Sequence, residues 1–357
     1  MKVSYLGMTS YEGPAPGIEV WPAPNRYCDP ETARASMERS LDLCVLAESL
    51  GFDWVSLSEH HYAPYQMTPN PVVMAAALTQ RVKRARIALL GPLVPLTNPV
   101  RLAEELAMLD ALSGGRLSVL FLRGTPNEHG TYDTPPEKTR SMTQEGIDLI
   151  LKAWQEHEPF SWSGENYNFK TISIWPRVVQ QPHPVVYGSG NSEESIMFAA
   201  ERRLGIGFSF APPEVVKGWV DLYYKAAAGF GWTPTPDHII YRGLAYVAET
   251  DAKAEADAAA YFGAKAAEQA KITSETMGGP PITPLILEPY FLGGTDTVVE
   301  RFATLRDCGV GVVDMAFVIG SHEQQVASLE LFAEKIIPTL HAWDKENLVT
   351  ESVAHSA

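Results

Sequence analysis

Short apolar runs alternate with longer segments of helical periodicity along most of the chain. The run KVSYLGM at 2–8, for example, is followed by a segment at 32–51 whose apolar residues recur every three or four positions before a glycine ends it. Runs of this length that are rich in Val, Ile and Leu are typical of buried parallel strands. The apolar runs predicted as strands are 2–8, 53–58, 86–91, 116–124, 184–190, 206–210, 239–249 and 311–320.

Each predicted strand leads into a predicted helix. This order predicts an α/β fold whose parallel sheet closes as a (β/α)8 TIM barrel, with insertions in the loops at its C-terminal face. An open doubly wound sheet is the alternative. We expect one barrel domain over 1–343, with a mobile lid insertion over 271–293 and a polar tail at 344–357. The predicted helices are 32–51, 70–82, 99–115, 142–154, 192–205, 214–231, 251–270 and 323–340.

The charge balance narrows the possible partners. The chain has 43 acidic and 28 basic residues, and the resulting net charge of −15 argues against nucleic acid and anionic membranes, which need a cationic surface. Small phosphorylated ligands stay possible, because they need only a local cation or a helix end. No run is long and apolar enough to span a membrane, and the start shows no signal-peptide pattern. A cytoplasmic protein is therefore expected.

Polar residues at the ends of strands are the candidates for chemistry, because TIM barrels carry their active sites at that face. The second predicted strand ends in Glu59, His60 and His61. A zinc site would need a third ligand at a suitable spacing, which the scattered histidines do not supply, so no metal is expected. An imidazole at a barrel mouth suits acid–base work, and a purely structural histidine is the alternative. Glu59 is expected to orient its neighbours.

The segment VVYGSGNSEESIMFAA at 185–200 predicts a strand, a small glycine-rich turn and a helix. Free N–H groups at the start of such a helix suit a phosphate. A plain capped helix explains the same residues, because Glu193 and Glu194 already face the positive end of the helix dipole. Arg123 ends an otherwise apolar strand at the same face, so it is expected to be buried and to pair with a phosphate or with a carboxylate of the protein.

Several motifs in order resemble the bacterial luciferase-like flavin-dependent monooxygenases, over roughly residues 1–340. They are SEHHY, PLTNPVRLAEELAMLDALSGGRL, LRGTPNEHGTY, QQPHPVVYGSGNSEES and SLELFAEKIIPTL. The resemblance implies a barrel that binds reduced FMN. Two departures are Asn98, where the family usually has His, and Leu122, where the luciferases have Cys before the arginine. The second departure argues against light emission.

The resemblance also implies roles for individual residues. His60, with His61 beside it, matches the histidine pair linked to the oxygen chemistry of the flavin, and Arg123 matches the phosphate-binding arginine. The Leu90–Gly91 peptide falls where family members often have a non-proline cis bond under the isoalloxazine ring. The residues expected to bind the cofactor are Leu90, Gly91, Asn98, Arg123, Gly188, Ser189, Gly190, Asn191, Ser192 and Ser195.

Long loops at 11–31, 61–70 and 271–293 are expected to roof the barrel mouth. Their aromatic and apolar residues favour an apolar or aromatic substrate, and ordinary loop packing is the alternative. The residues expected to line the substrate site are Trp21, Tyr62, Tyr65, Met67, Tyr290 and Phe291.

The resulting hypothesis is a two-component flavin monooxygenase. The chain has no nicotinamide fingerprint, so reduced FMN is expected from a separate flavin reductase. Oxygen would then form a C4a-(hydro)peroxyflavin that the barrel mouth shields from water while a small molecule is oxidised. A homodimer is expected from the resemblance. The alternatives are a deazaflavin-dependent dehydrogenase of the same fold and a non-catalytic flavin-binding protein.

Overall fold

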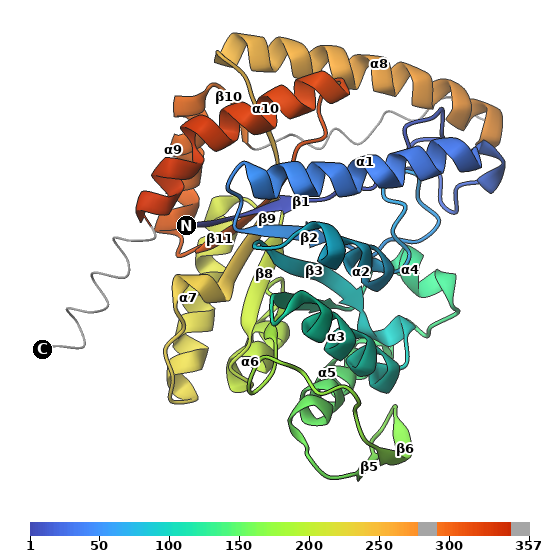
Figure 1. The fold of residues 1–357 in the computed structure, drawn as a ribbon, viewed down its shortest axis with the longest axis vertical. Helices are drawn as coiled ribbons and strands as arrows, with labels where there is room; N and C mark the ends of the chain where they lie inside the picture. The colour runs from blue at the N-terminus through green and yellow to red at the C-terminus, as the bar shows by residue number, and fades with distance from the viewer. Residues whose placement is uncertain (278–290, 344–357) are drawn as a thin grey trace, which may run out of the picture.

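Eight parallel strands form a closed barrel at the centre of the protein (Figure 1). The computed structural model describes residues 1–277 and 291–343. Neighbouring strands pair around the ring, and the pairing of β8 with β9 closes it, so the predicted TIM barrel is confirmed and the open sheet is excluded. The barrel strands are β1 (Lys2–Leu6), β2 (Trp54–Leu57), β3 (Arg86–Leu93), β4 (Leu117–Leu122), β7 (Val185–Ser189), β8 (Gly205–Ser209), β9 (Ile239–Val247) and β11 (Val312–Ala316).

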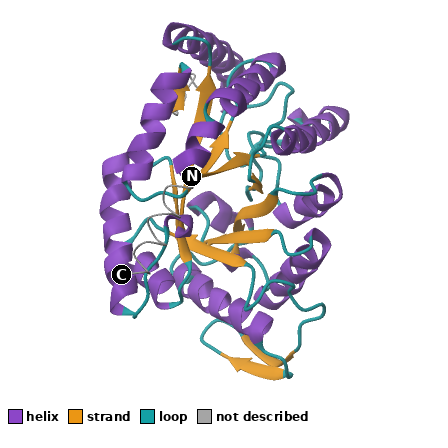
Figure 2. Ribbon diagram, turned by 60° about the vertical axis from the view of Figure 1, so that its left-hand side comes forward, coloured by secondary structure: helices purple, strands orange, loops and turns teal. Residues whose placement is uncertain are grey.

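Helices surround the barrel on the outside, as the purple ribbons around the orange strands in Figure 2 show. Several of them begin where the sequence offers a cap and a proline: Asp29, Asn70 and Asn98 accept hydrogen bonds from the first turns of α1, α2 and α3. The helices that follow the barrel strands are α1 (Pro30–Ser49), α2 (Pro71–Arg81), α3 (Pro99–Ser113), α5 (Thr139–Gln155), α6 (Glu193–Glu201), α7 (Pro213–Gly229), α8 (Asp251–Met277) and α10 (His322–Lys335).

Some elements do not appear in the sequence prediction. A β-hairpin, β5 (Phe160–Ser163) with β6 (Asn168–Ile172), projects from the barrel at the bottom of Figure 1. The loop after β4 contains the short helix α4 (Pro126–Thr131). A short strand, β10 (Phe291–Gly293), pairs with β9 outside the ring and leads into α9 (Thr295–Asp307).

The predicted lid over 271–293 is therefore only partly described. Residues 271–277 continue α8 and residues 291–293 form β10, so both ends of the segment belong to regular elements. The part between them, which includes Tyr290, lies outside the described residues, as does the predicted tail at 344–357.

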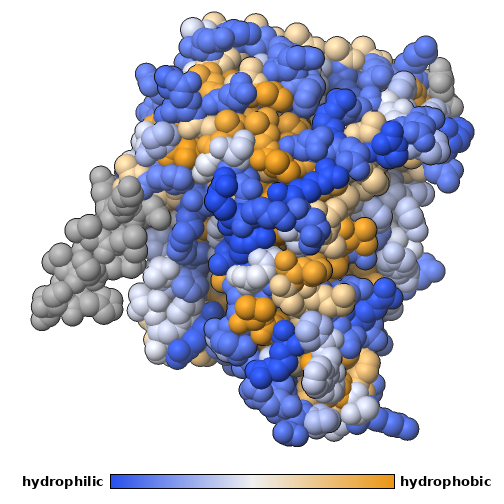
Figure 3. All heavy atoms as spheres, viewed as in Figure 1, coloured by the Kyte–Doolittle hydropathy of each residue, from blue (hydrophilic) through white to orange (hydrophobic). Residues whose placement is uncertain are grey.

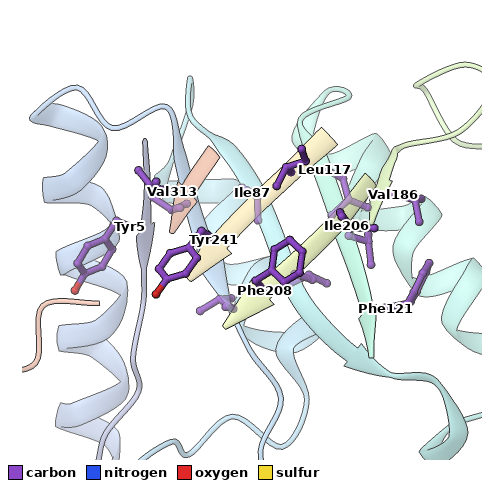
Figure 4. Packing of buried hydrophobic residues seen from close by; sticks show 14 of the residues in the cluster. Tyr5, Ile87, Leu117, Phe121, Val186, Ile206, Phe208, Tyr241 and Val313 are labelled. Carbon is purple, nitrogen blue, oxygen red and sulfur yellow. The ribbon is translucent and has the colours of Figure 1, made fainter. Parts of the chain in front are cut away.

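Two layers of apolar side chains hold the barrel together. The outer layer lies between strands and helices and includes Tyr5, Phe121, Phe208 and Tyr241 (Figure 4). The inner layer comes from the strands alone, because alternate side chains of each strand point into the barrel. Its buried members are Trp54, Ala88, Leu90, Leu120, Tyr187, Ile240 and Val312. Among the described residues these side chains fill the interior of the barrel, so a ligand site is expected at its C-terminal face.

Within the residues described, no helix combines the length and apolar character that crossing a membrane requires.

Candidate active site

A cavity of about 420 Å³ opens at the C-terminal ends of the barrel strands. Its walls come from the ends of β2, β3, β4 and β7, from β9 and from helices α5 and α6. Segments far apart in the sequence therefore meet at one mouth, as a barrel active site requires. The predicted residues that line it are His60, Leu90, Gly91, Arg123, Gly188, Ser189, Asn191, Ser192 and Ser195.

The two adjacent histidines after β2 lie in different environments. His60 lines the cavity, and 31% of its side chain is exposed. The His61 side chain is 2% exposed, and its Nε2 lies 3.0 Å from Glu59 Oε1. Glu59 Oε2 in turn accepts a hydrogen bond from the Leu93 backbone at 3.1 Å. His61 is thus buried behind the cavity wall, where it helps to fix Glu59, and its catalytic role stays a prediction.

Glu128 on α4 holds the ring of His60. Its Oε1 lies 2.7 Å from His60 Nδ1, and its Oε2 accepts hydrogen bonds from the Thr125 backbone at 2.7 Å and hydroxyl at 2.6 Å. Burial raises the pKa of Glu128, but the hydrogen bonds from His60 and Thr125 outweigh it and lower the pKa to about 2. Glu128 is therefore ionised at neutral pH. A carboxylate at Nδ1 places the proton of a neutral imidazole there and leaves Nε2 as an acceptor.

The chain reaches this arrangement through a tight turn after β4. Gly124 has a φ of 88°, in the left-handed region that glycine adopts without strain. The turn brings Thr125 to the start of α4, where Thr125 and Glu128 form a capping box. The same carboxylate thus caps a helix and orients an imidazole.

The opposite end of the cavity lies at the turn between β7 and α6. Ser192 caps α6 by accepting a hydrogen bond from the Ser195 backbone at 3.3 Å. Arg123 also lines the cavity, but it is exposed rather than buried and forms no ion pair with any carboxylate in the described part of the chain. Arg140 on α5 pairs with Glu194 at 2.8 Å at this end. Two guanidinium groups and a helix N-terminus make this end of the cavity suitable for an anion.

The wall between the two ends is the β3 segment at Leu90 and Gly91, whose peptide bond is cis. A Cβ atom on Gly91 would lie 2.2 Å from the Leu120 carbonyl oxygen, so only glycine fits at this position. The clash is with the neighbouring strand β4, so glycine lets β3 and β4 pack closely here, while Leu90 and Gly91 form part of the cavity wall.

A second cavity, of about 320 Å³, lies beside the first and shares Thr125 with it. Trp21 and Tyr65 line it, together with small and aliphatic residues of the loops at 17–21 and 63–65. The Tyr65 ring lies 5.4 Å from the His60 ring, and the Trp21 indole donates a hydrogen bond to the His61 carbonyl at 2.9 Å. The second cavity thus has a partly aromatic lining, and its Tyr65 packs against the imidazole of the first.

Residues 20–312 match the model of a family described as luciferase-like monooxygenase. The chain belongs to the luciferase-like monooxygenases.

Relatives of this luciferase-like monooxygenase include the oxygenase component of a flavin-dependent trigonelline monooxygenase from Acinetobacter baylyi. That match is 24% identical over 337 residues and covers 88% of this chain and 92% of the relative. A match to the alkanal monooxygenase alpha chain of Photobacterium leiognathi is 29% identical over 203 residues and covers 56% of this chain and 57% of the relative. The chain thus spans a little over half the length of the alkanal monooxygenase chain.

Solved structures share the fold. Monooxygenase RslO1 from Streptomyces bottropensis matches with a TM-score of 0.77 at 26% identity, over 95% of this chain and 99% of that one. Two structures below 25% identity show the fold alone. The oxygenating constituent of 3,6-diketocamphane monooxygenase from Pseudomonas putida, in complex with FMN, has a TM-score of 0.72 at 20% identity and covers 95% and 98% of the two chains. An F420-dependent secondary alcohol dehydrogenase with an F420–acetone adduct has a TM-score of 0.69 at 15% identity and covers 94% and 98%.

Other predicted cofactor residues of this luciferase-like monooxygenase lie away from the cavity. The Asn98 side chain accepts hydrogen bonds from the Val100 and Arg101 backbone at 3.0 and 3.2 Å, so it caps α3 and does not line the cavity. Gly190 is buried, and a Cβ atom there would lie 2.6 Å from the Phe208 ring. Its small size is therefore needed for packing inside the protein, and its contact with a ligand stays a prediction.

Some predicted substrate-lining residues are also placed elsewhere. Phe291 is fully buried and its ring stacks on Phe302 at 4.3 Å, so it belongs to the core beside β9. Met67 is half-buried and lines neither cavity. Tyr62 is 52% exposed and packs against Trp21 at 5.8 Å, at the rim of the second cavity. Of the predicted lining residues, Trp21 and Tyr65 line the second cavity directly.

Sequence reasoning gave no role to two cavity-lining residues of this luciferase-like barrel. Glu128 lies in a polar loop, 68 positions from the histidine that it holds. Arg242 lies within the apolar strand β9 and pairs with Asp314 on β11 at 2.8 Å. A charged residue inside an otherwise apolar strand was the available signal for Arg242, because such a residue needs a buried partner.

Proposed function

We propose that this protein is the oxygenase component of a two-component system. It would take reduced FMN from a separate flavin reductase and use O2 to oxidise an apolar or aromatic small molecule. The observation that carries the proposal is the single cavity that joins an anion-binding end, at Arg123 and the start of α6, to His60. A cofactor that carries a phosphate at one end and a flat ring system at the other would fit between these two ends of the cavity.

FMN fits the residues present. Its phosphate would be held by Arg123, Ser192 and the free N–H groups of α6, because guanidinium groups and helix N-termini are the usual phosphate ligands in proteins. Its ring system would lie on the Leu90–Gly91 wall, which lines the cavity. When bound, reduced FMN supplies the electrons that activate O2.

The protein's own residues would orient, shield and exchange a proton. His60 can take up or release a proton at Nε2 while Glu128 holds Nδ1, which fits a general acid or base at the cavity. Trp21 and Tyr65 would exclude water and bind the apolar part of the substrate. The pKa of Tyr65 is raised by burial and by the charge of Glu128, so its phenol keeps its proton at neutral pH. The residues with these roles lie at the ends of strands and in the loops beside them.

A deazaflavin-dependent dehydrogenase is the second candidate, because the fold is shared with an F420-dependent secondary alcohol dehydrogenase. Anaerobic titration of the protein with reduced FMN and with reduced F420 separates the two. The proposal predicts tight binding of reduced FMN and, after ¹⁸O₂ is admitted in the presence of a substrate, one labelled oxygen atom in the product. Binding of F420 with no binding of FMN would contradict it, as would a product without label from every substrate of an aromatic and carbonyl screen.

We also propose a cytoplasmic homodimer. Val73 on α2 and Met108 and Leu112 on α3 are 65%, 52% and 53% exposed, so these neighbouring helices place three large apolar side chains at the surface. Figure 3 shows small hydrophobic areas over this part of the surface, between hydrophilic ones. Sedimentation equilibrium of the wild-type protein and of a Met108→Lys, Leu112→Lys double variant tests this surface. The proposal predicts a dimer for the wild type and a monomer for the variant, and a monomeric wild type would contradict it.

A further inference from the structure

A row of polar side chains crosses the interior of the barrel below the cavity. Ser4 on β1 pairs in register with Asp314 on β11, and Asp314 pairs in register with Arg242 on β9. Residues in register on neighbouring parallel strands point to the same side of the sheet. These three side chains therefore stand next to one another inside the ring.

Hydrogen bonding within the row is incomplete. Asp314 is fully buried and accepts hydrogen bonds from the Ser56 hydroxyl at 2.6 Å and from Arg242 Nε at 2.8 Å. Its two oxygens are thereby engaged. Arg242 Nη2 and Ser4 Oγ, in contrast, are buried with no hydrogen-bond partner among the described residues. Buried polar atoms are nearly always paired, so the unpaired nitrogen of Arg242, the one residue of the row that lines the cavity among those described, points to a group that the protein alone does not supply.

The position of Arg242 shows where this group lies. Arg242 lines the cavity that also contains Leu90, Gly91 and His60. In the closed strand order, β9 lies four strands from β3 in either direction, so Arg242 faces the Leu90–Gly91 wall across the barrel. A ring system that lies on the β3 wall leaves the space toward β9 for a second molecule. Arg242 is therefore on the substrate's side of the cavity.

The charge of the row limits what it can bind. Arg242 and Asp314 neutralise each other, and 12% and 0% of their side chains are exposed. A carboxylate placed against Nη2 would add a second negative charge beside a buried carboxylate, with no cation to balance it. An uncharged carbonyl oxygen accepts the same hydrogen bond without this cost. The row thus offers a fixed donor and no net charge.

We propose that Arg242 is a specificity-determining residue whose Nη2 donates a hydrogen bond to an uncharged carbonyl oxygen of the substrate. This inference rests on the proposed function, because it assumes that FMN occupies the β3 side of the cavity. Asp314 is a positioning residue in this arrangement: it fixes the guanidinium plane and cancels its charge. Exchange of Asp314 for a neutral residue of the same size should therefore narrow the preference for a carbonyl over a carboxylate.

The experiment compares ligands of similar size on protein loaded with oxidised FMN, so that no turnover occurs. The probes are acetophenone with a carbonyl, ethylbenzene with no acceptor and benzoate with a carboxylate, and their binding is followed by calorimetry and by the flavin spectrum. Wild-type protein should bind acetophenone roughly 10- to 100-fold more tightly than ethylbenzene, as expected for one hydrogen bond from a charged donor. Benzoate should bind no more tightly than ethylbenzene.

Two variants assign the effect to the row. Arg242→Lys keeps a cation beside Asp314 but loses the planar fork, so the preference for acetophenone should fall roughly tenfold while ethylbenzene binding stays the same. Asp314→Asn makes the row cationic and should strengthen benzoate binding roughly tenfold. Thermal unfolding of each FMN-loaded variant checks that the fold is kept. Because the second variant predicts a gain of binding, a loss of stability cannot imitate it.

The results separate this inference from the proposed function. Failure of wild-type protein to bind FMN would defeat the proposed function. Normal FMN binding with equal affinities for the three probes, or with no binding of any of them, would defeat only the role of Arg242. If Arg242→Lys weakened FMN itself and left acetophenone unaffected, the acceptor would be a carbonyl of the flavin ring, and the assignment to the substrate would be wrong. If both variants bound FMN and all probes as the wild type does, Arg242 would contact neither molecule, and water alone would pair with the row.

Discussion

Two buried carboxylates hold a nitrogen donor against the same cavity, one from the loops and one from the barrel interior. Glu128 on α4 lies 2.7 Å from His60, and Asp314 on β11 lies 2.8 Å from Arg242. The difference lies in what each carboxylate holds. An imidazole gains and loses a proton near neutral pH, whereas a guanidinium keeps its protons at every physiological pH. The two pairs therefore suit different tasks: Glu128 with His60 suits proton exchange, and Asp314 with Arg242 suits a fixed hydrogen bond.

Removal of the imidazole should have the largest effect on activity. His60→Ala should lower kcat by roughly 10²- to 10⁴-fold, the usual contribution of a general acid or base, while FMN affinity stays within about twofold. Steady-state turnover with a flavin reductase and a separate FMN titration measure the two quantities. His61→Ala is the matched control, because this neighbour lies behind the wall, and it should keep most of its kcat. Equal losses in the two variants would mean that the cavity does not distinguish the histidines.

Removal of the carboxylate in the barrel should instead affect stability. Asp314→Leu leaves a buried guanidinium without its counter-ion, which should lower the free energy of unfolding by about 3–5 kcal/mol. Urea denaturation measures the change. Asp221→Leu removes an acid from an exposed pair with Lys217 on α7, and it should cost about 0–1 kcal/mol. Similar costs for the two substitutions would show that the barrel pair is no more important for folding than a surface pair.

Replacement of the loop carboxylate should give a pH-dependent effect. The pKa of Glu128 is lowered from 4.5 to about 2, so its ionised form stabilises the fold above pH 4.5, and this contribution is lost as the pH falls toward 2. Glu128→Gln should therefore cost about 1.5–3 kcal/mol at pH 7, and the cost should shrink as the pH falls below 4.5. Urea denaturation of both proteins between pH 7 and pH 4 measures it. A cost that grew on acidification would give the opposite sign to this pKa shift.

The smallest effect concerns the anion-binding end of the cavity. Ser192→Ala and Ser321→Ala each remove the cap of a helix, so each should cost about 1 kcal/mol of stability. Of the two, only Ser192 lines the cavity, so only its substitution should weaken FMN binding, by roughly tenfold for one hydrogen bond from a half-buried hydroxyl to a charged phosphate. Fluorescence titration with FMN compares the two. Equal FMN affinity in both variants would argue against a phosphate at α6.

The barrel could be predicted from the sequence because parallel strands are buried on both faces and read as continuous apolar runs. The hairpin β5–β6 could not, because its strands have only four and five residues and most of their side chains are half-buried or exposed. Strand β10 and helix α9 follow a proline-rich stretch, and proline-rich stretches predict a connection without helices or strands. Phe291 was assigned to the mouth for the same reason, although its ring packs in the core.

The candidate site was predictable where neighbouring residues carry the signal. The glycine–serine turn before α6 and the histidines after β2 are of this kind, and His60 does line the cavity. Pairings between distant segments were not predictable: Arg242 and Asp314 are 72 positions apart, and only the register of β9 and β11 brings them together. Asn98 shows the reverse case: the structure gives it a local capping role, and the cofactor contact that the resemblance implies stays a prediction.

The second cavity has a consequence for evolution. Its aliphatic lining at Ile18 and Val20 comes from a loop, while Asp314 is fixed on a strand and Glu128 is fixed by a helix cap. Mutations at Ile18 or Val20 can reshape the space for a substrate without disturbing either carboxylate, because loops tolerate change more readily than the elements they connect. Descendants of this protein could thus acquire new substrates by changes in the 17–21 loop while they inherit the same chemistry.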